Sequence, residues 1–161
     1  TLFNMLASRV GSFDGLSVVD LFAGSGALGL EALSRRAASC LFVEQDARAV
    51  EAIRKNIETL DARARSMVQQ GSVLSLSPAK AAHDVIFLDP PYDWPEAHTC
   101  LEAILDHALI APHGIAVLEH RDKQAPQTAT SWELFRRVYV GDTAFSFFGV
   151  AEGAETDDST G

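Results

Sequence analysis

The chain has 161 residues, of which 47% are hydrophobic, and its formal net charge is −9 at pH 7. This length and apolar content suffice for one domain with a substantial core. The negative charge argues against a simple basic nucleic-acid binder. No run of about eighteen apolar residues is present, so no membrane-spanning helix is expected.

The cysteines and histidines carry little chemistry in this chain. Cys40 and Cys100 are far apart in apolar surroundings, which is typical of buried free thiols in a cytoplasmic protein. The histidines show no paired metal spacing, so no metal site is expected. Because no exposed apolar stripe requires a partner chain, we expect a monomer.

The hydrophobic pattern predicts helices alternating with strands. In chain order, helices are expected at residues 1–10, 27–33, 46–60 and 96–110. Strands are expected at residues 16–22, 40–44, 65–70, 85–88, 115–119, 132–140 and 145–150. Pro112 and Gly114 are expected to end the fourth helix, and Gly141-Asp142 to join the last two strands as a hairpin. The pattern predicts an α/β fold with a doubly wound, mostly parallel seven-stranded sheet and a C-terminal antiparallel hairpin.

The end of the chain differs in composition from the rest. Residues 151–161 are acidic and rich in Gly, Ser and Thr, which is typical of a disordered tail. Residues 1–150 are expected to form a single domain. The first helix begins without a cap or a preceding turn, which suggests that its start is missing.

A glycine-rich turn joins the first predicted strand to the following helix. Gly24-x-Gly26-x-x-Gly29 matches the dinucleotide fingerprint. Glu44 follows about twenty residues later, where a ribose-binding acid is expected. Asp20, however, would repel a pyrophosphate placed at this turn. S-adenosylmethionine carries an ammonium, a sulfonium and a ribose but no phosphate, so Asp20 and Glu44 favour it over NAD.

A second motif, Asp89-Pro90-Pro91-Tyr92, directly follows the fourth predicted strand. Two prolines cannot continue a strand ladder, so the motif predicts a stiff loop at the edge of the sheet where ligands bind. The Asp89 carboxylate and the Pro90 carbonyl can both accept hydrogen bonds from one NH₂ group. The Tyr92 ring can stack on a planar base.

The stretch DLFAGSGALGLEAL, followed by VE and FLDPPY, resembles the RsmD family. These are bacterial methyltransferases that act on guanine N2 of small-subunit (16S) ribosomal RNA. The resemblance extends from FNMLA near the start to YVGDTAFSFF near the end. It implies a Rossmann-like methyltransferase sheet, S-adenosyl-L-methionine as the cofactor, and ribosomal RNA or the small ribosomal subunit as the partner.

The resemblance also implies roles for individual residues. Asp20, Gly24 and Gly26 would hold the methionine part of the cofactor. Glu44 would bind the ribose hydroxyls, and Gln45 would border the adenine. Asp89, Pro90 and Tyr92 would be the catalytic residues, and together with Pro91 they would hold the target base. Removing Asp20 is expected to weaken cofactor binding but to change stability little, since the residue is expected at the edge of a loop.

The chain departs from the family pattern at two places. The family usually has an acid after the third strand, near the adenine amino group, and Ser72 takes that place here. The basic stretch that precedes FNMLA in the family is absent, so the sequence is expected to be truncated there. RNA contacts would then come from that stretch or from local clusters, namely Arg35-Arg36 or Arg121 with Lys123.

Other functions remain open. An adenine-N6 methyltransferase acting on DNA or RNA would share the Asp-Pro-Pro-Tyr motif. A NAD-dependent oxidoreductase would share the glycines but not Asp20. A non-catalytic cofactor- or RNA-binding module would keep Gly24 and Gly26 but would not need Asp89 and Tyr92 together.

Overall fold

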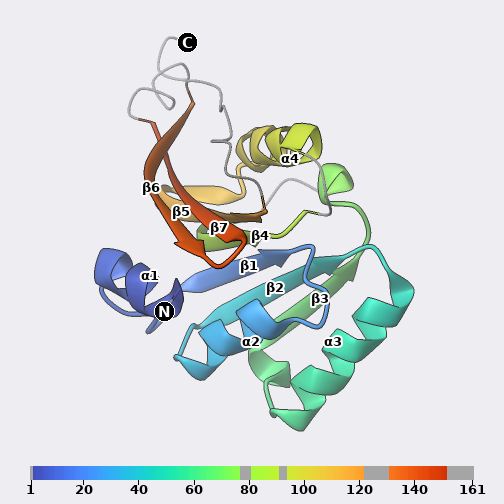
Figure 1. Ribbon diagram of the computed structural model, residues 1–161. Helices are drawn as coiled ribbons and strands as arrows, with labels where there is room; N and C mark the ends of the chain where they lie inside the picture. Colours follow the sequence, from blue (N-terminus) through green and yellow to red (C-terminus); the bar gives the residue numbers. More distant parts are fainter. Residues whose placement is uncertain (1, 77–80, 91–93, 122–130, 152–161) are drawn as a thin grey trace, which may run out of the picture. The chain divides into compact units, whose positions relative to one another are not determined.

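The computed structural model describes residues 2–76, 81–90, 94–121 and 131–151 (Figure 1). The chain divides into two compact units, Thr1–Ser75 and Leu76–Gly161. The tail predicted at residues 152–161 lies outside the described residues, and the single domain predicted over residues 1–150 stays a prediction. Among the described helices, none has the length and hydropathy needed to cross a membrane.

The first unit alternates helices with three strands. Its elements are α1 (Leu2–Val10), β1 (Ser17–Leu21), α2 (Ala27–Ser34), β2 (Ser39–Glu44), α3 (Ala47–Thr59), η1 (Arg63–Arg65), β3 (Ser66–Gln70) and η2 (Val73–Ser75). The strands are parallel and lie in the order β3-β2-β1. Helix α2 packs on β1 and β2, and α3 packs on β2 and β3 (Figure 1).

Local sequence explains the elements of this unit. The last four residues of β1 are buried, which is typical of a strand covered on both faces. The Asp46 carboxylate accepts a hydrogen bond from the Ala49 amide at 3.2 Å, so it caps α3 as predicted. Val50, Ile53 and Ile57 form the buried face of that helix.

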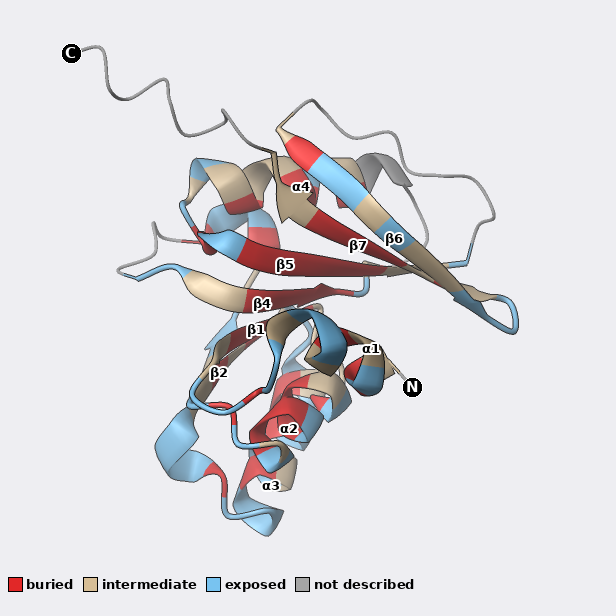
Figure 2. Cartoon of the chain, turned by 90° about the vertical axis from the view of Figure 1, so that its left-hand side faces the viewer, coloured by how far each residue is buried: buried red, intermediate tan, exposed pale blue. Residues whose placement is uncertain are grey.

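The second unit contains a mixed arrangement of four strands. Its elements are β4 (His83–Leu88), α4 (Trp94–Asp106), β5 (Ile110–His120), β6 (Trp132–Val140) and β7 (Thr143–Val150). Their order is β4-β5-β7-β6, in which β4 and β5 are parallel and both pairings of β7 are antiparallel. Gly141 adopts a φ of 63° in the tight turn between β6 and β7, so the predicted hairpin is confirmed. Figure 2 shows β5 and β7 largely buried and β6 more exposed.

The prediction that the fourth helix reaches residue 110 is wrong. The helix ends at Asp106, and Ala108 adopts a left-handed conformation with a φ of 51°. The amide of Leu109 then donates to the Ile104 carbonyl at 2.9 Å, which is the six-to-one bond of a Schellman motif. Leu109 and Ile104, the two positions at which this motif often has an apolar contact, are both buried. The helix therefore ends without the glycine that would have signalled its end.

The next strand consequently begins earlier than predicted. β5 starts at Ile110, and its pairing with β4 shifts register between Ile110 and Ile115. Pro112 lies exposed in this irregular segment. Proline has no N–H group, and an irregular segment tolerates this because no regular ladder bond is required there. Gly114 is buried, and a Cβ there would lie 2.6 Å from the Ile110 side chain. Both residues therefore shape the start of a strand and do not end a helix.

Candidate functional site

The glycine turn follows β1 and contains three residues in the left-handed region, which strains Phe22 but not the two glycines. Phe22, Gly24 and Gly26 adopt φ values of 58°, 57° and 82°. A Cβ added at Gly24 would meet no atom within 4 Å, so this part of the turn is open. A Cβ at Gly29 would clash with the Phe42 ring and lie 2.6 Å from the Cys40 sulfur. Gly29 is therefore required for packing α2 on β2, whereas Gly24 borders open space.

Asp20 is buried, with a side chain only 3% exposed. Its Oδ2 accepts a hydrogen bond from the Gly29 amide in the first turn of α2, at 3.0 Å. The prediction that this acid lies at a loop edge is wrong, since Asp20 lies in β1. The expectation that its removal changes stability little is based on that position and stays untested. Burial, with a further contribution from the Asp20 charge, raises the pKa of the neighbouring Cys40 thiol. The Asp20 carboxylate thus occupies the Gly29 amide at the start of the helix. In a dinucleotide-binding protein, a phosphate would bind amides at this place.

Glu44 ends β2 and binds two backbone amides. Its Oε1 accepts from Gly24 at 2.9 Å, and its Oε2 accepts from Asp46 at 2.8 Å. The carboxylate therefore connects the glycine turn to the start of α3. Each carboxylate oxygen has a second lone pair, so Glu44 can still accept from a hydroxyl.

Two further predicted residues lie after the neighbouring strands. Gln45 is exposed directly after β2. Ser72 follows β3, and its Oγ accepts from the Leu74 amide at 3.1 Å, so the hydroxyl caps η2. Sequence reasoning missed Asn56 of α3, whose side-chain amide donates to the Ser25 carbonyl at 3.0 Å and so steadies the turn.

We define the glycine-turn site by its six predicted residues, Asp20, Gly24, Gly26, Glu44, Gln45 and Ser72. Its carboxylates and its open turn at Gly24 fit a ligand that carries positive charge and hydroxyl groups. A phosphate at the start of α2 would meet the buried Asp20 carboxylate. S-adenosylmethionine therefore fits the residues present better than NAD.

A second site, the carboxyl-pair site, lies in the second unit. Asp89 and Pro90 directly follow β4, and Glu119 stands near the end of β5. Leu88 and Leu118 are paired in register, so the acids that follow them are neighbours. The Asp89 and Glu119 side chains are hydrogen-bonded to each other. The predicted residues Pro91 and Tyr92 lie outside the described residues.

The pKa values of Asp89 and Glu119 are both raised, but the neighbouring groups act on them in opposite directions. Asp89 is exposed at the end of β4 and Glu119 is half-buried. Partial desolvation still raises the pKa of Asp89, although the Glu119 hydrogen bond and the positive charge of Arg121 oppose this. Burial also raises the pKa of Glu119, and both the charge of Asp89 and the hydrogen bond raise it further. These charges favour an ionised Asp89 and a protonated Glu119, which makes Glu119 a candidate partner of Asp89. Sequence reasoning missed this role, although two acids that follow adjacent predicted strands were a usable signal.

The basic cluster Arg35-Arg36 has mainly local contacts. The Arg35 side chain lies 3.3 Å from the Glu31 carboxylate and stacks 5.0 Å from the centre of the Phe3 ring. Arg36 lies 3.9 Å from the Asp14 carboxylate. These contacts give the cluster a structural role, and Lys123 of the other predicted cluster lies outside the described residues.

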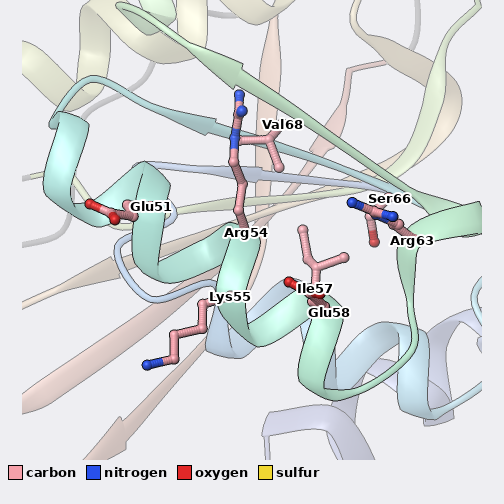
Figure 3. Close-up of a pocket in the computed structure, with 8 residues that line it drawn as sticks. All are labelled: Glu51, Arg54, Lys55, Ile57, Glu58, Arg63, Ser66 and Val68. Atoms are coloured by element: carbon pink, nitrogen blue, oxygen red, sulfur yellow. The ribbon is translucent and has the colours of Figure 1, made fainter.

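A hollow of about 470 Å³ lies elsewhere in the first unit, between α3 and the segment around β3 (Figure 3). It is lined by Glu51, Arg54, Lys55, Ile57, Glu58, Arg63, Ser66 and Val68, none of which is a predicted site residue. Figure 3 shows Arg54 and Lys55 extending in different directions, so these two cations do not converge on one anion. In the part of the chain that is described, no group of three or more His, Cys, Asp or Glu side chains could hold a metal ion.

The alternating elements, the glycine turn and the acid at the end of β2 define an α/β methyltransferase of the Rossmann-like class. The chain belongs to the RsmD family, whose model, described as Conserved hypothetical protein 95, matches residues 1–149. Ribosomal RNA small subunit methyltransferase D of Escherichia coli (strain K12) is 31% identical over 158 residues, which cover 98% of this chain and 78% of that protein. The methyltransferase D of Haemophilus influenzae is 30% identical over 152 residues, covering 92% and 77%.

Solved structures share the same fold. The protein yhhF from Escherichia coli matches with a TM-score of 0.83 and 29% identity, over 93% of this chain and 84% of that chain. An RNA methyltransferase from Salinibacter ruber, solved with S-adenosyl-L-homocysteine, has a TM-score of 0.75 and 17% identity, over 97% and 94%. At that identity the likeness supports the fold alone. The predicted fold class and the resemblance to the RsmD family are both confirmed.

Proposed function

We propose that this chain transfers a methyl group from S-adenosyl-L-methionine to the exocyclic N2 amine of a guanine in small-subunit ribosomal RNA. The observation that carries the proposal is the match to ribosomal RNA small subunit methyltransferase D, at 31% identity over 98% of this chain. The chemistry of the two sites supports it, since one suits the cofactor and the other suits an amine.

In the glycine-turn site, the cofactor supplies an electrophilic methyl group on a sulfonium when it is bound. The buried charge of Asp20 would favour the cationic methionine part, and the turn at Gly24 is open enough to border it. Glu44 would use its remaining lone pairs for the ribose hydroxyls. Gln45 and Ser72, after β2 and β3, would border the adenine.

In the carboxyl-pair site, Asp89 and the Pro90 carbonyl would accept hydrogen bonds from the target amine. The lone pair of that nitrogen is delocalised into the guanine ring, and two such hydrogen bonds favour a pyramidal nitrogen whose lone pair is directed outward. Positioning of this kind can contribute about 7–11 kcal/mol in favourable systems. The cofactor would give up its methyl group by breaking its carbon–sulfur bond, which leaves S-adenosyl-L-homocysteine, and the amine that gains the methyl group would lose one proton to water or to Asp89. The base must be unpaired or swung out to enter the site.

The test is methylation of small-subunit particles, and of their free RNA, from a strain that lacks the enzyme. We expect incorporation of one labelled methyl group, identified as N2-methylguanine by mass spectrometry of the digested RNA. An N6-methyladenine product would overturn the proposed base and favour the adenine-N6 alternative. Absence of transfer, with cofactor binding retained, would favour a non-catalytic module.

The relatives support ribosomal RNA as the partner in general terms. Whether free RNA or an assembled subunit is the substrate is decided by the same experiment. The monomeric state and the cytoplasmic location stay predictions, and sedimentation of the purified chain checks the former.

A further inference from the structure

The carboxyl-pair site contains a contact that the proposed function does not by itself require. β4 and β5 are parallel, and Leu88 is paired with Leu118, so Asp89 and Glu119 extend from adjacent strand positions. Their side chains are hydrogen-bonded to each other. Two carboxylates are both acceptors, so this hydrogen bond exists only when one of the groups carries a proton.

The surroundings decide which group carries it. Arg121 acts on Asp89 with a positive charge and favours its ionised form. Glu119 instead experiences the negative charge of Asp89, which favours its protonated form. On the other side of β5, Phe145 of β7 is paired with Glu119 and has no polar atom in its side chain. The next residue, His120, bonds to Ser146 at 2.8 Å and so belongs to a separate contact.

We propose that Glu119 is a positioning residue, whose protonated carboxyl donates to one oxygen of Asp89 and leaves the other oxygen to accept from the substrate amine. This inference rests on the proposed function, in which Asp89 orients the amine. An aspartate at the start of a loop can rotate about its two side-chain torsions. A fixed donor on the neighbouring strand restricts that rotation and keeps the accepting oxygen directed at the substrate.

Glutamine and leucine separate this role from simple packing. Glu119→Gln keeps a donor of nearly the same shape, since the side-chain amide can donate to Asp89. Glu119→Leu keeps the volume but removes the donor. Glu133→Gln, an exposed change on β6, serves as the matched control.

We expect Glu119→Gln to retain most of kcat and Glu119→Leu to lose about 10- to 100-fold, the size of effect that misplaced groups produce. The KM for S-adenosylmethionine should stay unchanged in both, and Glu133→Gln should match the parent. Circular dichroism and cofactor titration verify that each variant is folded. Equal activity of all variants would overturn the inference. It would also be overturned if Glu119→Gln were as inactive as Glu119→Leu.

A second readout does not depend on activity. In protein with ¹³C-labelled carboxyl groups, Asp89 and Glu119 should titrate as one interacting pair, and in Glu119→Gln the Asp89 signal should titrate in a single step. Independent titration of the two groups in the parent would overturn the shared proton. If the parent transfers no methyl group, the proposed function fails, and this titration alone decides whether the hydrogen bond exists.

Discussion

At the scale of single residues, Asp20 combines a structural and a binding role. It is buried, and it satisfies the Gly29 amide at the start of α2. A buried donor left without an acceptor costs about 1–3 kcal/mol. The same negative charge is assigned to the cationic part of the cofactor. Stability and binding therefore depend on one carboxylate.

We accordingly expect Asp20→Ala to lower the free energy of unfolding by about 1–3 kcal/mol and also to weaken S-adenosylmethionine binding. Asp20→Asn should be milder for stability, because its amide oxygen can still accept from Gly29. Urea denaturation and calorimetric titration measure the two effects. Asp14→Ala, at an exposed position, is the control and should change neither. Unchanged stability of Asp20→Ala would contradict the assigned hydrogen bond.

Asp89 tests the chemistry of transfer. We expect Asp89→Ala to abolish methyl transfer and to leave cofactor binding intact. Asp89→Asn should keep partial activity, since the amide oxygen still accepts from the substrate amine. An obligatory general base would lose nearly all activity on becoming asparagine. Single-turnover assays with labelled cofactor distinguish the two cases, and an Asn variant as inactive as the Ala variant would exclude orientation as the main role.

At the scale of elements, Gly24 and Gly29 of the Gly24-x-Gly26-x-x-Gly29 motif are needed for different reasons. Gly29 lies in α2, where a Cβ would meet Phe42 and Cys40 of β2. Gly24 adopts a φ of 57° and faces open space. Packing of a helix on a strand explains the first glycine, and backbone conformation explains the second.

Gly29→Ala should therefore destabilise the protein by about 1–3 kcal/mol through overpacking. The double variant Gly29→Ala with Cys40→Ala should recover part of that loss, because it removes one of the two clashing groups. Gly24→Ala should cost about 1–2 kcal/mol through backbone strain, and Cys40→Ala should not relieve it. Thermal and urea denaturation of the three single variants and the two double variants check these two double-mutant cycles. Equal effects of Cys40→Ala on both glycine variants would contradict the distinction.

The end of α4 provides a second test at this scale. Ala108 adopts a φ of 51°, which glycine adopts without strain. We expect Ala108→Gly to stabilise the protein by about 0.5–1 kcal/mol, after the entropic cost of glycine in the unfolded chain is subtracted. Ala103→Gly, inside the same helix, should instead destabilise it by about 1 kcal/mol. Destabilisation by both changes would argue against the left-handed helix end.

At the scale of the whole molecule, the net charge of −9 limits binding to RNA. Arg35 and Arg36 lie in the first unit, near the Glu31 and Asp14 carboxylates, whereas the exposed Arg121 follows the strand that contains Glu119 and acts on Asp89 with its charge. Arg121 is therefore the best described candidate for a phosphate contact near the target base.

We expect this chain to bind single-stranded RNA with a shallow salt dependence, no steeper than a slope of about −3 in log K against log salt. Arg121→Ala should reduce the magnitude of that slope by about 0.7, the value of one phosphate contact. Arg48→Ala, an exposed change on α3, should leave it unchanged. Fluorescence anisotropy over a range of salt concentrations measures the slopes. A slope unchanged by Arg121→Ala would remove this residue from the RNA-binding surface.

Features that depend on neighbouring residues could be read from the sequence. The apolar periods predicted the four α-helices and seven strands of the described residues, but not η1, η2, the end of α4 or the start of β5. Asp46 predicted the start of α3, and Gly141 predicted the hairpin. The glycine turn and the Asp-Pro-Pro-Tyr motif also indicated the family, which the relatives confirm. These signals are local. Backbone conformation, the helix period of about 3.6 residues and the strand period of about 2 all depend on residues a few positions apart.

Features that depend on long-range packing required the tertiary structure. Glu119 lies beside Asp89 only because β4 and β5 pair in one register. Asp20 is buried because α2 folds back over β1. Strand register and burial are stabilised by contacts between residues that lie far apart in the sequence. A local pattern contains no signal for them, and for this reason only the folded chain decided them.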